Sequence, residues 1–186
     1  MKLLVVVDYQ NDFVNGALGF EGADKIDEGI ANKITNGNYD AIVCTFDTHA
    51  AKDEYLKTRE GIALPVPHCE KDTEGHALYG KTAEAINNSE KPVYKINKPT
   101  FATQPSIMVT AKANIEIMTK QKNVESVEFV GLVTNMCVLS QVVCWQGLYP
   151  EAQMIVDASL VDSFNKDLHE KTLDVLEGIQ VKVINR

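Results

Sequence analysis

A cysteine is the residue of this sequence that most clearly suggests covalent chemistry. Cys137 follows an apolar run and lies in the first turn of a predicted helix, where free backbone N–H groups and the positive end of the helix dipole stabilise a thiolate. The same N–H groups could hold the oxyanion that forms when a thiolate attacks a carbonyl carbon. A free cysteine is more often a small buried hydrophobic residue, which is our interpretation of Cys144 on the same helix.

Two charged residues are candidate partners of this thiol. Asp8 follows a predicted strand and could accept and return the thiol proton, although an aspartate in this position more commonly caps a turn. Lys98 has apolar neighbours; beside Asp8 and Cys137 its ammonium would favour the negative forms of both, whereas most lysines are solvated surface charges. His169 is the one histidine after Cys137 and lies in a predicted helix, which disfavours a papain-like cysteine–histidine pair.

A second group of residues has metal-ligand chemistry. Asp47 and His49 are two residues apart at the end of a predicted strand, and His68 follows at a distance. Mixed nitrogen and oxygen donors suit Zn²⁺, and they also bind Mn²⁺ or Fe²⁺. Hydrogen-bonded turn residues would explain an Asp-x-His pair about as often, so both interpretations stay open at this point.

Several aromatic residues lie near these candidates. Phe13 and Phe101 follow Asp8 and Lys98 closely; core packing is their default role, although a planar substrate would need such walls. We predict that Trp145 packs in the core and that His76 lies at the surface without a partner.

The elements that must position these residues alternate between strands and helices. Continuous apolar runs are typical of strands buried on both faces of a parallel sheet, and they predict strands over residues 3–7, 41–46, 92–96, 127–133, 154–156 and 181–184. Apolar residues at helical spacing predict a helix with Ile26, Ile30 and Ile34 on one face and another with Ile107, Ala111, Ile115 and Met118. Two more helices are predicted over residues 134–148 and 166–176.

This alternation predicts an α/β fold: a three-layer α/β/α sandwich with a mainly parallel, six-stranded, Rossmann-like sheet. We find no linker or repeat and therefore expect residues 1–186 to form a single domain. Ligands of such sheets bind at the carboxyl ends of the strands. Asp8, Asp47, Lys98 and Cys137 all follow or end predicted strands, so we expect them to meet at one edge of the sheet.

Composition limits the classes of partner. The chain of 186 residues has 26 acidic and 18 basic residues and a net charge of −8, which argues against binding to nucleic acid. The longest apolar run near the N-terminus, residues 3–7, is too short for a membrane span or a signal-peptide core, and four dispersed cysteines form no disulfide framework. We therefore expect a cytoplasmic protein that acts on a small molecule.

The sequence resembles the isochorismatase-like cysteine hydrolases, the superfamily that contains the nicotinamidases. The resemblance is carried by Asp8 with Gln10, Asp12 and Phe13; by Asp47-Thr48-His49 with Asp53 and Tyr55; by Pro67-His68-Cys69 with Thr73 and Gly75; by Lys98; and by Gly131-Leu132-Val133-Thr134-Asn135-Met136-Cys137-Val138. The last segment closely matches the signature G-x-x-T-[ND]-x-C-V of this superfamily and is the most specific of these motifs.

The resemblance implies a catalytic triad of Asp8, Lys98 and Cys137. In this scheme Cys137 attacks a carboxamide carbon, Asp8 carries the proton to the departing ammonia, and water then hydrolyses the thioester. The resemblance also implies a cis peptide bond between Leu132 and Val133, which would direct the amide of Val133, with that of Cys137, toward the oxyanion.

The resemblance further implies a divalent metal, with Zn²⁺ favoured over Mn²⁺ or Fe²⁺, held by Asp47, His49 and His68. This metal would anchor the substrate, for example through a ring nitrogen, and Glu60 could be a further ligand. The resemblance also implies a homo-oligomer with active sites near the interfaces.

One departure concerns the substrate. Nicotinamidases tend to have a bulky aromatic residue just before the proline that precedes the metal-binding histidine, but residues 64–68 read Leu-Pro-Val-Pro-His, so one stacking wall is missing or comes from elsewhere. We therefore expect a cysteine-dependent hydrolase of a small carboxamide, nicotinamidase-like, that releases ammonia. The alternatives are an isochorismatase-type vinyl-ether hydrolase, which would need more positive charge at the site, and a catalytically silent ligand-binding scaffold, against which the intact triad argues.

Overall fold

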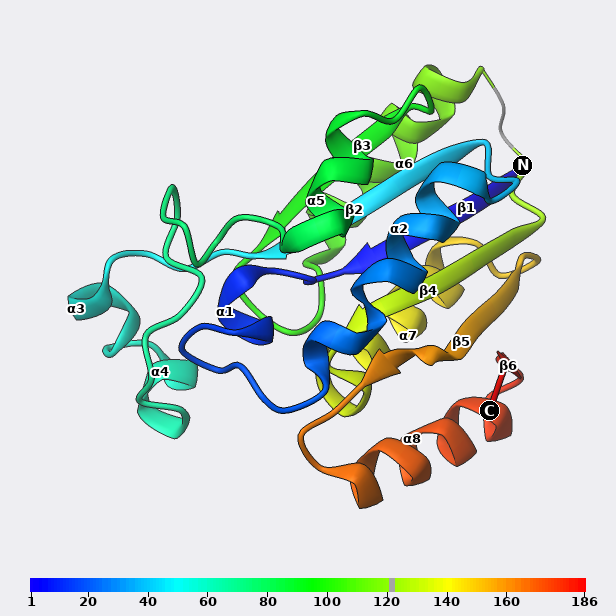
Figure 1. The fold of residues 1–186 in the computed structure, drawn as a ribbon. Helices are drawn as coiled ribbons and strands as arrows, with labels where there is room; N and C mark the ends of the chain where they lie inside the picture. The colour runs from blue at the N-terminus through cyan, green and yellow to red at the C-terminus, as the bar shows by residue number, and fades with distance from the viewer. Residues whose placement is uncertain (121–122) are drawn as a thin grey trace.

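The computed structural model describes residues 1–120 and 123–186, and its centre is a six-stranded, all-parallel sheet (Figure 1). The strand order is β3-β2-β1-β4-β5-β6. The strands are β1 (Lys2–Val7), β2 (Ala41–Asp47), β3 (Val93–Lys98), β4 (Ser126–Leu132), β5 (Gln153–Asp162) and β6 (Lys182–Ile184). The predicted fold class is therefore confirmed.

The central strand β1 shows why this sheet must be covered on both sides. Residues 3–7 are all fully buried, as expected for a parallel strand between two layers of helices. Val7 lies opposite Thr45 of β2 and Gly131 of β4. The carboxyl ends of these three neighbouring strands therefore lie together at one edge of the sheet.

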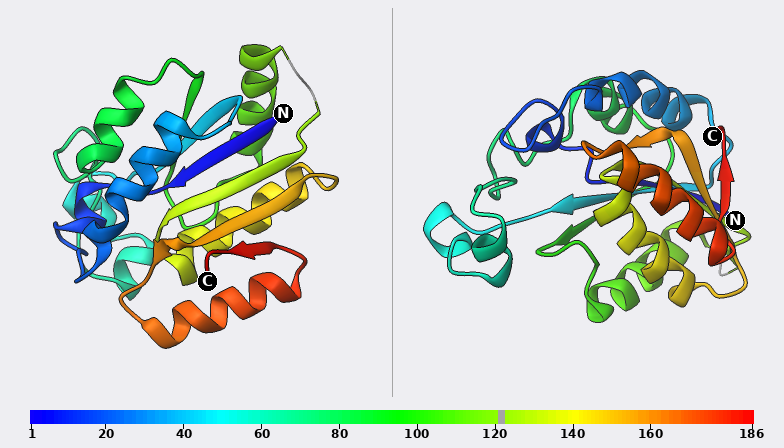
Figure 2. Two further views of the ribbon diagram at one scale, coloured as in Figure 1. Left: turned by 45° about the vertical axis from the view of Figure 1, so that its right-hand side comes forward. Right: turned by 90° about the horizontal axis from the view of Figure 1, so that it is seen from below.

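Helices cover the two faces of the sheet. Figure 2, in the view from below, shows α2 on one side of the strands and α6, α7 and α8 on the other. The first layer contains α1 (Asn11–Val14), a 3₁₀ turn (Ala23–Ile26), α2 (Asp27–Asn36) and α5 (Gly80–Asn87); the second contains α6 (Pro105–Thr119), a π-helical turn (Thr134–Val138), α7 (Leu139–Leu148) and α8 (Lys166–Gly178). Two short helices, α3 (Lys52–Tyr55) and α4 (Arg59–Ala63), lie beyond the carboxyl end of β2 (Figure 1).

Two apolar cores hold the three layers together. Leu4, Val6 and Ile42 pack with Ile30 and Ile34 of α2 on one face. On the other face, Val5, Val43 and Phe129 pack with residues of the second helical layer, among them Ala111, Ile115, Val142, Trp145 and Leu173. Trp145 is fully buried, as predicted.

The predicted elements differ from the structure in three places. Strand β5 extends to Asp162, far beyond the predicted residues 154–156. The prediction is too short because the polar residues Asp157 and Ser159 interrupt the apolar run, at a bulge in the pairing of β5 with β4. The buried face of α6 includes Met108, whereas Met118 is 39% exposed. The predicted helix over residues 134–148 begins with the π-helical turn. Among the described residues, no helix is long and apolar enough to cross a membrane.

Candidate active site

Three strands and one helical turn bring the candidate triad together. Asp8 follows β1 with a left-handed backbone conformation (φ 44°), and its Oδ1 accepts a hydrogen bond of 2.6 Å from the Thr45 hydroxyl of β2. Lys98 is the last residue of β3, and Cys137 lies in the π-helical turn that follows β4. All three triad side chains are buried. The expected meeting of these residues at the carboxyl edge of the sheet is therefore found in the structure.

Lys98 is at the centre of this group. Its Nζ lies 2.6 Å from Asp8 Oδ2 and 3.6 Å from Cys137 Sγ. It also donates a hydrogen bond of 3.0 Å to the Thr100 carbonyl oxygen and lies 3.7 Å from Asp47 Oδ1. Burial alone lowers the pKa of a lysine, but the neighbouring acidic groups outweigh it and raise the pKa of Lys98. Lys98 is therefore an ammonium that is shared between the triad and the metal-ligand group.

The protonation of the thiol differs from the sequence-based expectation. Burial raises the pKa of Cys137 well above 9.0; the charge of Lys98 opposes this rise, but the carboxylate of Asp8 adds to it. The helix start was expected to stabilise a thiolate, whereas in the folded protein the burial and the nearby carboxylates favour the thiol. A base must therefore remove the proton before the sulfur can attack. Burial also raises the pKa of Asp8, against the effect of Lys98, so Asp8 holds a proton more readily than an exposed aspartate.

The backbone next to Cys137 is unusual. The peptide bond between Leu132 and Val133 is cis, which agrees with the expectation for this segment. The Val133 carbonyl oxygen accepts hydrogen bonds from the N–H groups of Met136 and Val138. Val133 and Cys137 both line the same cavity.

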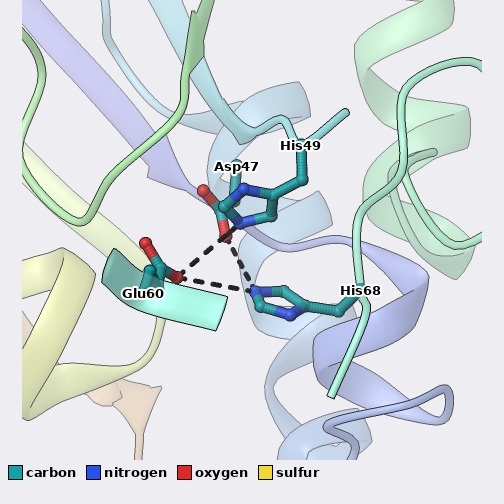
Figure 3. A group of neighbouring side chains, drawn as sticks. All are labelled: Asp47, His49, Glu60 and His68. Atoms are coloured by element: carbon teal, nitrogen blue, oxygen red, sulfur yellow. Dashed lines mark hydrogen bonds and ion pairs between the residues drawn. The ribbon is translucent and has the colours of Figure 1, made fainter. Parts of the chain in front are cut away.

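The metal-ligand candidates converge beside the triad, and Figure 3 shows their side chains pointing toward one another. His49 Nε2 lies 3.0 Å from Asp47 Oδ2 and 3.7 Å from Glu60 Oε1. His68 Nε2 lies 3.2 Å and 3.9 Å from the same two oxygen atoms. The four ligand atoms all lie within 4.8 Å of one another. Glu60, which the sequence indicated only weakly, therefore belongs to the group.

The chemistry of this group fits a divalent cation. Asp47 Oδ1 and Glu60 Oε1 are buried and, among the described residues, have no hydrogen-bond partner. Two such carboxylates are costly to bury without a positive charge between them. His68 Nδ1 lies 2.8 Å from the Val66 carbonyl oxygen, which can only accept, so Nδ1 carries the hydrogen and Nε2 is available as a ligand. Two imidazoles and two carboxylates are a donor set that suits four-coordinate Zn²⁺.

The ionisation of the group supports this interpretation. Burial acts to raise the pKa of Asp47, but the contacts of its carboxylate with the imidazoles of His49 and His68 and the charge of Lys98 outweigh burial and lower the pKa below 3.8. Asp47 is therefore an anion, the form in which a carboxylate binds a metal.

An apolar cavity of about 350 Å³ opens onto both groups. Its lining includes Asp47, His68 and Cys137 together with Phe13, Ala17, Leu18, Gly19, Phe20, Leu64, Phe101, Val133, Met136 and Phe164. A larger hollow of about 920 Å³ lies between α2 and α5, and none of the candidate residues lines it. The smaller cavity is therefore the place where a ligand could reach the thiol.

The structure shows how the aromatic residues lie. Phe13 is buried and its ring centroid is 5.4 Å from that of His68. Phe101 is 39% exposed and lines the cavity, so core packing is the wrong default for it. Leu64 lines the cavity in the segment that lacks the aromatic residue, and two rings from other loops, Phe20 and Phe164, contribute to the lining with their centroids 6.2 Å apart. Nothing in their sequence context indicated this role.

Two further polar residues support the site. Gln10 Nε2 donates to the Asp47 carbonyl oxygen (2.9 Å), and Gln10 Oε1 accepts from the Asp47 N–H (2.8 Å). The resemblance includes Gln10 but implies no role for it. His76 is not an unpartnered surface residue as predicted: it is half-buried and its Nε2 lies 2.9 Å from Thr48 Oγ1. His169 lies on α8, where its Nδ1 is 2.9 Å from Thr134 Oγ1.

An all-parallel six-stranded sheet, with helices on both sides and these groups at its carboxyl edge, is the isochorismatase-like α/β fold. Residues 2–186 match the Isochorismatase domain family, and the chain belongs to this family. The uncharacterized isochorismatase family protein PncA of Bacillus subtilis (strain 168) is 32% identical over 178 residues, which cover 90% of each protein.

Solved structures share the fold along nearly the whole chain. Nicotinamidase PncA from Bacillus subtilis has a TM-score of 0.77 at 27% identity and covers 98% of both chains. The pyrazinamidase/nicotinamidase of Streptococcus mutans UA159 has a TM-score of 0.79 at 25% identity and covers 99% of this chain and 100% of its own. The pyrazinamidase of Pyrococcus horikoshii, solved in complex with zinc, has a TM-score of 0.71 at 22% identity over 100% of this chain and 99% of its own.

Proposed function

We propose that the protein hydrolyses a small carboxamide and releases ammonia, with Cys137 as the nucleophile. The observation that carries this proposal is the buried contact of Lys98 with both Asp8 and Cys137 at the wall of an apolar cavity. Such an arrangement places a thiol, a base and a fixed positive charge next to a space for substrate.

In the proposed reaction, Asp8 accepts the thiol proton as Cys137 Sγ forms a bond to the amide carbonyl carbon. The backbone N–H groups of Val133 and Cys137 stabilise the resulting oxyanion. Asp8 then donates the proton to the amide nitrogen, the C–N bond breaks, and ammonia leaves. A water molecule attacks the thioester carbon, Asp8 accepts its proton and passes it to the sulfur, and the carboxylic acid is released. Lys98 keeps a positive charge beside the acidic groups throughout.

We propose that Asp47, His49, Glu60 and His68 hold a divalent metal, with Zn²⁺ favoured over Mn²⁺ or Fe²⁺. The donor set and the two unpartnered carboxylate oxygens support this assignment, and the Pyrococcus horikoshii pyrazinamidase is in complex with zinc. When bound, such an ion supplies a Lewis-acidic point that binds and orients a substrate nitrogen or oxygen atom.

The cavity favours an uncharged, ring-containing amide. Its walls are largely aromatic and aliphatic, and among its described lining residues none is lysine or arginine. The dicarboxylate of an isochorismate-like acid would find no basic side chain there, because Lys98 is fully buried and paired with Asp8. Nicotinamide is therefore the first substrate to test, in keeping with the names of the Bacillus and Streptococcus structures.

The cellular location, the oligomeric state and the partners of the protein stay predictions. We expect a cytoplasmic homo-oligomer that has a small-molecule substrate and does not bind nucleic acid or membranes; the net charge of −8 supports the exclusion of nucleic acid. Light scattering coupled to gel filtration measures the oligomeric state directly.

The test is ammonia release from nicotinamide and a panel of other small amides, with and without added Zn²⁺ or Mn²⁺. We expect release from nicotinamide that is abolished in Cys137→Ala, with little change in Tm. Turnover that persists in Cys137→Ala would exclude the thiol mechanism. If no amide is hydrolysed although metal is bound and Cys137 can be alkylated, the carboxamide proposal is wrong and isochorismate becomes the substrate to test.

A further inference from the structure

The segment between β3 and α6 contributes two groups to the proposed active site, although most of its residues are exposed. In residues 99–104, the Thr100 carbonyl oxygen accepts the hydrogen bond from Lys98 Nζ, and the Phe101 side chain lines the cavity. Five of these six residues are exposed, and Thr103 is the buried one. An exposed segment without regular structure needs an anchor if it is to hold side chains in fixed positions.

That anchor is on the helix of the nucleophile. Gln141 lies four residues after Cys137, about one helical turn, and its side chain is fully buried. Gln141 Nε2 donates a hydrogen bond of 3.0 Å to the Phe101 carbonyl oxygen, and Oε1 accepts one of 3.0 Å from the Thr103 hydroxyl. Since the carbonyl oxygen can only accept, the NH₂ group must face Phe101, so the orientation of the amide is fixed.

We infer that Gln141 is a positioning residue that holds the 99–104 segment against α7, the helix that continues the turn of Cys137. It thereby fixes the positions of the Lys98 ammonium and of the Phe101 ring. This inference rests on the proposed function. The other side-chain contact from α7 to the segment is weaker, because Cys144 Sγ lies 3.8 Å from the Thr103 carbonyl oxygen. Gln141 therefore makes the main side-chain hydrogen bonds between α7 and the 99–104 segment.

The contacts of Lys98 show why these hydrogen bonds matter for the reaction. Its ammonium lies between Asp8 and the Thr100 carbonyl oxygen, at 2.6 and 3.0 Å. If the segment moves, the Thr100 contact is lost and the ammonium can shift away from Cys137 Sγ toward Asp47, which is 3.7 Å away. Phe101 moves with the same segment, and the cavity then loses one wall.

The test compares two leucine variants on one helix. Gln141→Leu removes both hydrogen bonds at similar side-chain size. Gln146→Leu is the matched control, because Gln146 also lies on α7 and also donates from Nε2 to a backbone carbonyl, that of Ile179 at 2.9 Å. Small displacements of catalytic groups cost about tenfold to a hundredfold in rate. For nicotinamide we therefore expect Gln141→Leu to lower kcat and raise KM, with kcat/KM at least about tenfold below that of Gln146→Leu.

Two additional measurements separate positioning from folding and from the proposed function. Thr103→Val removes one of the two hydrogen bonds, so we expect a smaller loss of kcat/KM, and this variant decides the matter if Gln141→Leu does not fold. Alkylation of Cys137 by iodoacetamide needs no turnover, and we expect Gln141→Leu to react more slowly than Gln146→Leu because the ammonium beside the sulfur has shifted. Equal kcat/KM per folded site and equal alkylation rates in the Gln141 and Gln146 variants would overturn the inference. If the wild type hydrolyses no amide, the proposed function fails and the alkylation rates alone decide the inference.

Discussion

The carboxylate of Asp8 has contacts that suit a group which must both accept and donate a proton. Oδ1 accepts a hydrogen bond from the Thr45 hydroxyl, and Oδ2 lies 2.6 Å from Lys98 Nζ. Oδ2 is buried, and the Lys98 ammonium balances its charge. Burial raises the pKa of this carboxyl against the effect of the ammonium, so Asp8 takes up a proton more readily than an exposed aspartate while the ammonium still stabilises its anion. Such a balance is what general acid–base catalysis requires.

Asp8→Asn tests this role at the residue scale. The asparagine keeps the size of the side chain and can still accept from Thr45, but it cannot take the thiol proton. A positioned general base contributes about 10²- to 10⁴-fold, and we expect kcat for ammonia release to fall by that factor. Asp27→Asn is the control, because Asp27 is also a buried carboxylate but accepts from the backbone N–H groups of Lys81 and Thr82 at the start of α5. Full activity in Asp8→Asn would show that another group moves the proton.

At the scale of elements, the close approach of β1 and β4 positions the start of the π-helical turn that contains Cys137. Gly131 has a φ of +113°, and a Cβ atom there would lie 2.1 Å from the Val7 carbonyl oxygen. This backbone atom belongs to the strand that leads directly to Asp8, so no side-chain rearrangement could relieve the contact. The glycine lets the two strands that carry Asp8 and Cys137 lie side by side up to their ends.

Gly131→Ala should therefore be strongly destabilising. A backbone clash combined with a positive φ belongs to the mechanisms behind the larger losses of stability, about 3 kcal/mol or more. Gly147→Ala is the matched control on α7: a Cβ there meets nothing within 4 Å, and alanine is favoured over glycine in a helix by about 0.5–1 kcal/mol. Urea denaturation of both variants measures the two free energies of unfolding. A Gly131→Ala variant as stable as the wild type would contradict this account of the strand contact.

The scale of elements also shows what a single sequence can predict. The uninterrupted apolar run of β1 predicts this strand, and it also marks Asp8 as the residue that follows the strand. The predicted β5 is shorter than the observed strand because Asp157 and Ser159 interrupt the apolar pattern. These polar residues fit inside the strand because Asp157 accepts hydrogen bonds from Ser159 and Asn185. Helical periodicity predicts α6 and the burial of Ala111 and Ile115, but Met108 rather than Met118 completes the buried face.

At the scale of the whole molecule, the site depends on contacts between distant segments. The candidate triad and metal ligands were predicted because each follows or ends a strand or matches a motif. The roles of Gln10, Gln141 and Phe164 are not predicted, since they come from partners far away along the chain: Asp47 is 37 residues from Gln10, and Phe101 is 40 residues from Gln141. A glutamine in an otherwise ordinary helix carries no local signal. The role of Gln141 follows only from its contacts with Phe101 and Thr103 in the folded chain.

The proposed metal site would link these distant segments to global stability. Its candidate ligands come from the end of β2, from α4 and from the loop that contains His68, and among the described residues the buried atoms Asp47 Oδ1 and Glu60 Oε1 have no hydrogen-bond partner. A ligand that binds the folded state alone, at about 100 times its Kd, adds about 2.7 kcal/mol. For a chain of this size each kcal/mol corresponds to about 2–4 °C, so removing the metal with a chelator should lower Tm by roughly 5–10 °C, and added Zn²⁺ should restore it.

His49→Ala should lose metal in elemental analysis, and its Tm should show no further shift with chelator. Phe164→Ala, which changes the cavity wall but none of the ligands, should keep both the metal and the shift. An unchanged Tm after complete removal of metal from the wild type would mean that the buried carboxylates are neutralised by protons instead.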